Sequence, residues 1–140
     1  MNPVDIALVQ GSFRKIAPIA DQAAALFYTR LFELDPALRA LFRGDMQEQG
    51  RKLMAMLATA VGSLDRLESL IPAVQALGAR HARYGVLEEH YASVGAALIW
   101  TLQKALGLEF SPGLRAAWTE AYTALAQIMI DAQRGTRAAA

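Results

Sequence analysis

The chain holds two histidines, and they lie in different settings. His81 falls on an apolar helical face with Val74 and Leu77, at spacings of four and three residues. An imidazole on such a face is costly to bury unless its ring nitrogens are used. His81 is therefore either a side chain that serves a site or a core histidine bonded to a backbone carbonyl. His90 falls in a polar, acidic first turn, where we expect it to be exposed to solvent.

Three further residues could take part in the same chemistry. Gln49 heads an apolar stripe that continues through Leu53 and Leu57 at spacings of four. It is either a polar group at the edge of a pocket or the exposed first turn of a helix. Tyr28 either directs its hydroxyl into a site or lies at the core boundary with that hydroxyl in water. Phe42 follows a proline turn, and its ordinary place would be the core.

Helices must position these residues, because helical periodicity runs through the whole chain and no segment alternates with period two. Pro18 separates the first two helices, and Pro112 suits the first turn of the last one. We expect an all-α fold of about seven helices, over residues 3–17, 18–34, 35–42, 46–64, 69–82, 88–106 and 112–134. Residues 1–134 are expected to form one domain, and residues 135–140 a disordered tail.

Composition limits the classes of function. The 140 residues are 54% hydrophobic and 19% charged, with a net charge of +1, which predicts a compact domain without a large basic surface for nucleic acid. The absence of cysteine excludes disulfides, thiolate ligands and a cysteine nucleophile. The longest uncharged run, about residues 91–103, is too short to span a bilayer, and no secretory signal is visible. We expect a cytoplasmic protein that does not enter a membrane.

Four segments of the chain together resemble the bacterial globins, in the lineage of flavohaemoglobins and neuroglobin-like proteins. The segments are LFYTRLFELDP at 26–36 with Leu41 and Phe42 after it, QGRKLM at 49–54, LGARHARYGV at 77–86 and WTEAY at 118–122. The resemblance covers residues 5–133 and rests most on the order and spacing of Phe42, Gln49 and His81. It implies a single-domain globin with a three-over-three helical arrangement around haem b.

The resemblance also implies roles for individual residues. His81 matches the proximal histidine that binds iron, and Phe42 matches the phenylalanine that stacks on the porphyrin. Tyr28 and Gln49 match the two distal polar positions. Bound oxygen takes negative charge from ferrous iron, so a donor aimed at it forms a hydrogen bond worth about 1.5–3 kcal/mol. The residues implied to wall the pocket are Leu53, Leu57, Leu77, Val86, Tyr91 and Val94, and the candidates to pair with the haem propionates are Arg51, Lys52 and Arg83.

Two positions depart from patterns within the family. Gln49 replaces the histidine that many globins carry on the distal side, which argues against a resting state with two histidine ligands. In flavohaemoglobins a tyrosine and a glutamate support the proximal histidine, and Tyr91 matches that tyrosine. The position of the glutamate falls on Gln133, while Asp131 is offset by two residues. A neutral amide cannot supply the same charge, which argues against strong activation of oxygen.

Three functions follow as expectations. The first is reversible binding of oxygen and other diatomic ligands, for storage, delivery or sensing. The second is a nitric oxide dioxygenase, which would depend on a separate reductase because these 140 residues hold no flavin domain. The third is a haem-free interaction module, against which His81, Phe42 and the distal polar pair argue. Either a monomer or a dimer is compatible with the sequence.

Overall fold

The computed structural model describes the backbone of residues 1–139 and the side chains of residues 1–135, and it is helical without strands in that range. The α-helices are α1 (Pro3–Ile16), α2 (Ala20–Leu34), α3 (Met46–Gly62), α4 (Leu67–Arg83), α5 (His90–Leu106) and α6 (Pro112–Ala139). Short 3-10 helices lie between them: η1 (Ala17–Ile19), η2 (Pro36–Leu41), η3 (Leu64–Arg66) and η4 (Gly107–Glu109). The predicted all-α class is confirmed, and the short helix expected after residue 35 is the 3-10 helix η2.

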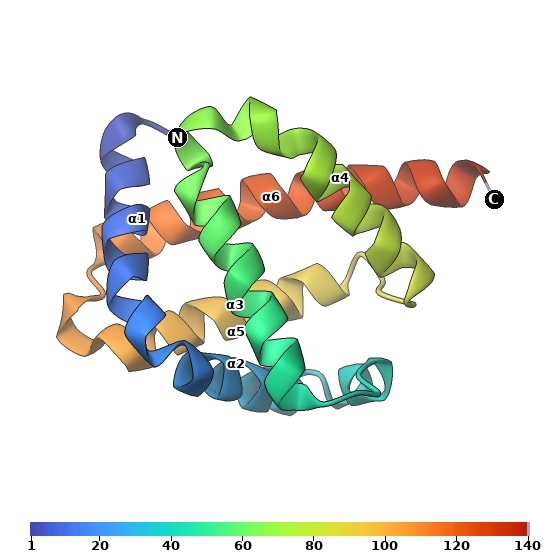
Figure 1. Ribbon diagram of the computed structural model, residues 1–140, viewed down its shortest axis with the longest axis horizontal. Helices are drawn as coiled ribbons and strands as arrows, with labels where there is room; N and C mark the ends of the chain where they lie inside the picture. Colours follow the sequence, from blue (N-terminus) through green and yellow to red (C-terminus); the bar gives the residue numbers. More distant parts are fainter. Residues whose placement is uncertain (140) are drawn as a thin grey trace.

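The helices form two layers. In Figure 1, α1, α3 and α4 lie in front of the layer that α5 and α6 build with α2, and α3 crosses α5 and α6. The packing agrees, because α4 packs on α6, α2 on α5, and α1 on both α5 and α6. The expected three-over-three arrangement is therefore confirmed. Within the described residues, no helix combines the length and the apolar character that crossing a bilayer requires.

Several helix ends differ from the prediction. α4 begins at Leu67 rather than near residue 69, so Pro72 lies inside the helix and removes one N–H from its ladder. α5 begins at His90 rather than at residue 88, because the preceding residues form turns. α6 continues to Ala139, past the end expected at residue 134. The side chains of 136–140, which make up most of the expected tail, lie outside the described residues.

Glycines allow two close helix contacts beside the predicted site. A Cβ on Gly50 of α3 would lie 2.9 Å from the Cβ of Ala24 on α2. A Cβ on Gly78 of α4 would lie 2.6 Å from the carbonyl oxygen of Met129 on α6. The second contact is the more restrictive, since the neighbour is backbone and cannot turn aside. Gly78 therefore sets how closely α4, the helix that carries His81, approaches α6.

We expect Gly78→Ala to destabilise the protein by about 1–3 kcal/mol, because the new methyl group collides with the backbone of Met129. Urea unfolding followed by circular dichroism measures this loss. Gly62→Ala is the matched control, because no atom lies within 4 Å of its added Cβ. That control should be neutral or gain up to about 1 kcal/mol. Equal stability of the Gly78→Ala variant and the wild type would refute the close contact.

Candidate functional site

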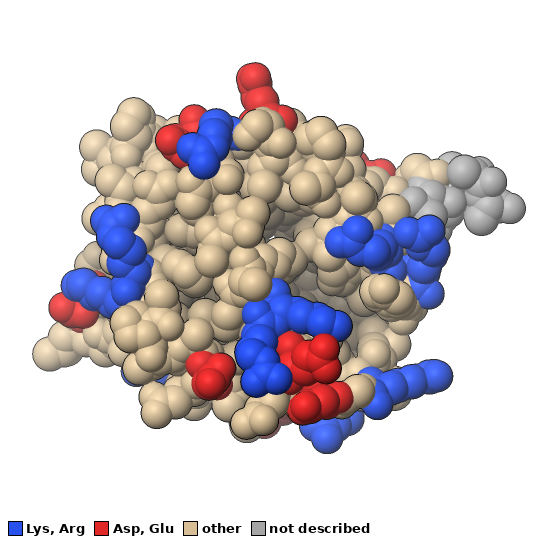
Figure 2. All heavy atoms as spheres, in the orientation of Figure 1, with Lys and Arg blue, Asp and Glu red and all other residues tan. Residues whose placement is uncertain are grey.

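The predicted site residues lie on and between α2, α3, α4 and α5, and Figure 2 shows a hollow between α3 and α4. Most of them are half-buried, as expected for side chains that line an open slot. The half-buried members are Phe42, Gln49, Leu53, Leu57, Leu77, His81, Val86 and Val94, and the buried members are Tyr28 and Tyr91. The slot is therefore mainly apolar, with an imidazole, an amide and two phenols among its residues.

His81 lies in the last turn of α4, and its ring is held in one orientation. Its Nδ1 lies 2.7 Å from the carbonyl oxygen of Leu77. Because a carbonyl only accepts, Nδ1 carries the proton and Nε2 presents a lone pair. Among the described residues no hydrogen bond is made to Nε2. This is the arrangement of an imidazole that binds a metal through Nε2, with its other nitrogen fixed by a backbone carbonyl.

The electrostatic surroundings keep the His81 imidazole neutral. Burial lowers its pKa below the usual 6.5, and nearby Arg80 lowers it further, while the hydrogen bond to the Leu77 carbonyl opposes both effects in part. A lowered pKa means that the ring is unprotonated at neutral pH. Nε2 is therefore available as a ligand rather than blocked by a proton.

Tyr28 on α2 and Gln49 on α3 are brought together, although 21 residues separate them in sequence. Gln49 Nε2 donates to the Tyr28 hydroxyl oxygen over 3.4 Å, which is long for a hydrogen bond. The tyrosine hydroxyl accepts this bond and keeps its own proton to donate. Burial raises the pKa of Tyr28, and the hydrogen bond from Gln49 opposes that rise in part. Tyr28 is thus a neutral donor.

An aromatic cluster fixes Tyr28 and Phe42. The Tyr28 ring meets Phe27 and Phe42 edge to face, with centroids 5.0 and 5.3 Å apart, and it stacks with Phe32 at 6.0 Å. Phe32 and Phe42 contact each other at 5.5 Å. Phe42 follows directly after η2, so the short 3-10 helix delivers its ring to the same cluster. These contacts limit the directions in which the Tyr28 hydroxyl can point.

Two contacts behind His81 were not predicted. Gln133 on α6 is fully buried, and its Nε2 donates to the carbonyl oxygen of Val86 over 2.6 Å. The Tyr122 hydroxyl donates to the carbonyl oxygen of Tyr91, also over 2.6 Å. The first bond holds the loop after α4 against α6, and the second holds the start of α5 against α6. The only sequence signal for Gln133 is its match to the flavohaemoglobin glutamate, and the structure shows this neutral amide bonded to the loop.

Basic side chains flank the hollow on both helices. In Figure 2 blue atoms gather over the first half of α3 and over the end of α4. Arg51 and Lys52 lie on α3, Arg80 and Arg83 lie on α4, and all four are exposed. Lys52 Nζ lies 3.9 Å from Glu48 Oε1, a weak surface pair. Acidic groups of a cofactor in the slot would meet positive charge on either side.

His90 is not brought to this slot. It is half-exposed at the start of α5, and its Nδ1 accepts a hydrogen bond from the backbone N–H of Leu87 over 2.9 Å. The histidine therefore closes the turn before α5. Of the two histidines, His81 therefore remains the candidate ligand.

Comparison with known proteins identifies the family. The Globin family matches residues 25–129, so the chain belongs to the globin family. The flavohemoprotein of Bordetella parapertussis is 31% identical over the whole chain, which spans 36% of that relative's length. Neuroglobin of Danio rerio is 32% identical over 92% of this chain and 90% of its own.

Solved structures agree with the family and the fold. An engineered carbene transferase from Rhodothermus marinus, provisionally a nitric oxide dioxygenase, matches with a TM-score of 0.89 and 28% identity, covering 99% of this chain and 97% of its own. A bacterial globin from Campylobacter jejuni matches with a TM-score of 0.84 and 24% identity, covering 96% of this chain and 97% of its own. The second likeness supports the fold.

The family binds haem b, and the residues of the slot fit that cofactor. The donor set offers one neutral imidazole with its Nε2 lone pair available, which suits a porphyrin that brings four nitrogens of its own. The apolar side chains of both layers suit the faces of the ring. The exposed arginines and lysine suit its two acidic groups.

Proposed function

We propose that this globin binds oxygen and other diatomic ligands reversibly, at a haem held through His81. The observation that carries this proposal is the hydrogen bond between the two distal side chains, Gln49 and Tyr28. The Tyr28 hydroxyl accepts from Gln49 and keeps its own proton, so the pocket offers a hydrogen-bond donor. The haem iron, when bound, supplies the place where a diatomic ligand is held and the electron density that gives the ligand partial negative charge.

The distal residues select and retain the ligand. A hydrogen bond to a group with negative charge is worth about 1.5–3 kcal/mol, and the Tyr28 hydroxyl donates it. Gln49 supplies amide donors from the facing helix and orients the phenol. Leu53 and Leu57 on the same face of α3 exclude water from the pocket, which protects the reduced state that oxygen binding needs.

The proximal side favours binding over activation of oxygen. His81 Nδ1 is bonded to the Leu77 carbonyl, and among the described residues no carboxylate hydrogen-bonds to the ring. A carboxylate partner would make the imidazole more basic and push more electron density toward the ligand. Gln133 stands where flavohaemoglobins carry the glutamate, and its amide bonds to the Val86 carbonyl. The imidazole therefore remains a neutral ligand of moderate basicity.

A nitric oxide dioxygenase is the second candidate, and two relatives favour it. The curated relatives include flavohemoproteins, and the Rhodothermus marinus protein is provisionally a nitric oxide dioxygenase. The same Tyr28 and Gln49 pocket would serve this reaction. Each turnover consumes an electron, so the reaction would need a reductase to supply it. In either role the protein would act in the cytoplasm, as a monomer or a dimer.

One experiment separates the two functions. The oxygen-loaded protein is mixed with substoichiometric nitric oxide, and nitrate is measured over many additions with a chemical reductant or a purified flavin reductase present. The oxygen-binding function predicts that repeated turnover stays no faster than slow reduction of the ferric form. Sustained nitrate formation with the reductase, at hundreds of turnovers, would instead establish the dioxygenase.

The distal donor should persist at alkaline pH. Because burial raises the pKa of Tyr28 above its ordinary value of 10.0, the hydroxyl keeps its proton as pH rises toward that value. We expect the oxygen dissociation rate, measured by stopped flow, to stay constant from pH 7 to pH 10. A rise in that rate below pH 10, absent in Tyr28→Phe, would show that the hydroxyl ionises early and would contradict the raised pKa.

A further inference from the structure

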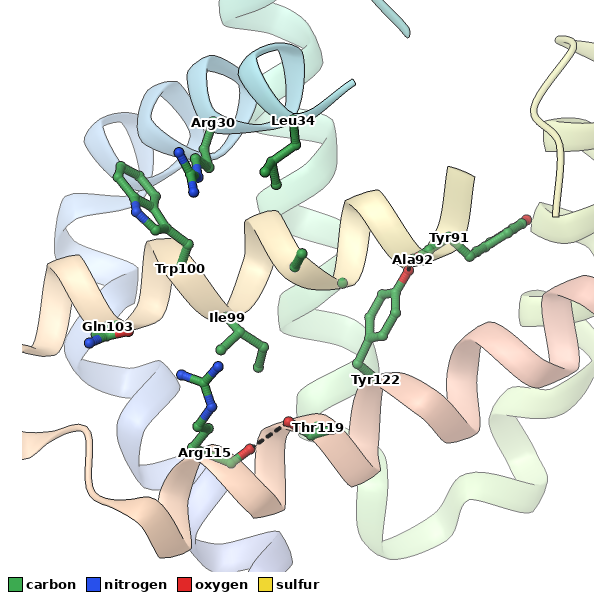
Figure 3. A pocket seen from close by; sticks show the side chains of 12 residues that line it. Arg30, Leu34, Tyr91, Ala92, Ile99, Trp100, Gln103, Arg115, Thr119 and Tyr122 are labelled. Carbon is green, nitrogen blue, oxygen red and sulfur yellow. Dashed lines mark hydrogen bonds between the residues drawn. The ribbon is translucent and has the colours of Figure 1, made fainter. Parts of the chain in front are cut away.

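A second cavity lies outside the slot. It is a groove of about 510 Å³ that runs across α5, with α2 on one side and α6 on the other (Figure 3). It shares only Tyr91 with the predicted haem-site residues, and Figure 3 shows the Tyr91 ring directed away from the groove. The volume lies within the range of about 300–1,000 Å³ that is usual for small-molecule sites.

One part of the groove is apolar. Its floor is the face of α5 that carries Ala92, Ala96 and Ile99, and both alanines are exposed. The small side chains of Ala92 and Ala96, four residues apart, leave a trough along the helix. Leu34 of α2 forms part of the wall and is 41% exposed, although it is a large apolar residue. A hydrocarbon chain laid along α5 would cover these side chains.

The other part of the groove is cationic. The guanidinium group of Arg30 lies over the Trp100 ring, 5.2 Å from its centroid, and Lys104 Nζ lies 5.5 Å from the same ring. In Figure 3 the Arg115 side chain reaches from α6 toward α5, in the half of the groove that holds Trp100. Arg30 forms an ion pair with Glu33, whose Oε2 lies 3.8 Å from an Arg30 terminal nitrogen. Positive charge therefore predominates here.

Arg30 has donor capacity that the protein does not use. Its Nε is buried, and it has no hydrogen-bond acceptor among the described residues. Because this Nε is inaccessible, an anion in the groove would contact Arg30 through the rest of its guanidinium group, and the side chain as a whole is 33% exposed. Arg115 is exposed and forms no ion pair within the described part of the chain. Both arginines are thus available to an anion that enters the groove.

We propose that the α2–α5–α6 groove binds a medium-chain carboxylate. The carboxylate lies against Arg30 and Arg115, and the hydrocarbon tail follows the alanine face of α5 toward Leu34. The positive end selects an anion, and the apolar trough selects a tail. A neutral alcohol of the same length satisfies only the trough, and a quaternary ammonium of the same length is repelled by the arginines.

The test is calorimetric titration of the haem-loaded ferric protein, with cyanide added to occupy the iron, using decanoate below its micelle concentration. We expect one decanoate per chain, and at least tenfold weaker binding of decanol and of decyltrimethylammonium. The double variant Arg30→Gln with Arg115→Gln should bind decanoate at least tenfold more weakly. A control that removes two exposed arginines elsewhere, Arg14→Gln with Arg66→Gln, should bind it as the wild type does.

A steric variant locates the ligand independently of charge. Ala96→Trp places a large ring in the trough from an exposed position, so the Soret band and the thermal unfolding midpoint should stay unchanged. Decanoate binding should disappear. Undiminished decanoate binding in Ala96→Trp, equal binding of decanol, or failure of the wild type to bind decanoate would overturn the proposal. So would a wild-type dimer, seen by sedimentation, that Ala96→Trp dissociates while decanoate does not bind.

Discussion

His81→Gly should lose most of its haem during purification and regain it when imidazole is supplied in solution. The variant removes the Nε2 lone pair, so that haem would be held only by apolar packing and exposed ion pairs. Added imidazole can enter the space that the side chain vacates and replace the missing ligand. The ratio of Soret absorbance to protein absorbance, with and without imidazole, measures both effects.

The matched control for this prediction is His90→Asn. It removes the second imidazole but keeps a side-chain acceptor for the Leu87 N–H. It should retain haem at the level of the wild type. Full haem retention by His81→Gly without imidazole, or loss of haem by His90→Asn, would reject His81 as the protein's ligand.

Tyr28→Phe should raise the oxygen dissociation rate roughly tenfold or more. The variant keeps the ring that packs on Phe27 and Phe42 and removes only the hydroxyl. The lost hydrogen bond is worth about 1.5–3 kcal/mol, and each 1.4 kcal/mol is a factor of ten. Stopped-flow displacement of oxygen by carbon monoxide measures the rate.

Two further variants serve as a comparison and a control for Tyr28→Phe. Gln49→Leu should also speed dissociation, by a factor no larger than that of Tyr28→Phe, because it removes the amide donor while the phenol remains. Tyr84→Phe, at a side chain that is 67% exposed, should leave the rate unchanged. If the off-rate of Tyr28→Phe equals that of the wild type, Tyr28 does not donate to the ligand.

The helices could be predicted because their signals are local. Apolar residues at spacings of three and four recur along the chain, and prolines mark the first turns or breaks of several helices. The helix ends that differ from the prediction depend on individual contacts. The start of α5 at His90 follows from turns over the preceding residues, closed by the bond from the Leu87 N–H to His90 Nδ1. A pattern of residue types carries no signal for such a bond.

The site was predictable from resemblance more than from physics. By spacing alone His81 stayed open between a ligand and a core residue bonded to a carbonyl, and the structure shows that bond, to Leu77, alongside an Nε2 without one. The contact of Gln133 with Val86 joins residues 47 apart, and the pairing of Arg30 with Trp100 joins α2 to α5. These contacts depend on how the helices cross, so the amino-acid pattern of one helix could not reveal them.

The most direct test of reversible oxygen binding is an absorption spectrum recorded through repeated cycles of oxygenation and deoxygenation. We expect an intense Soret band, a shift of that band when oxygen is added to the reduced protein, and full recovery of the deoxygenated spectrum over several cycles. Conversion to the ferric form at the first exposure to oxygen would contradict it.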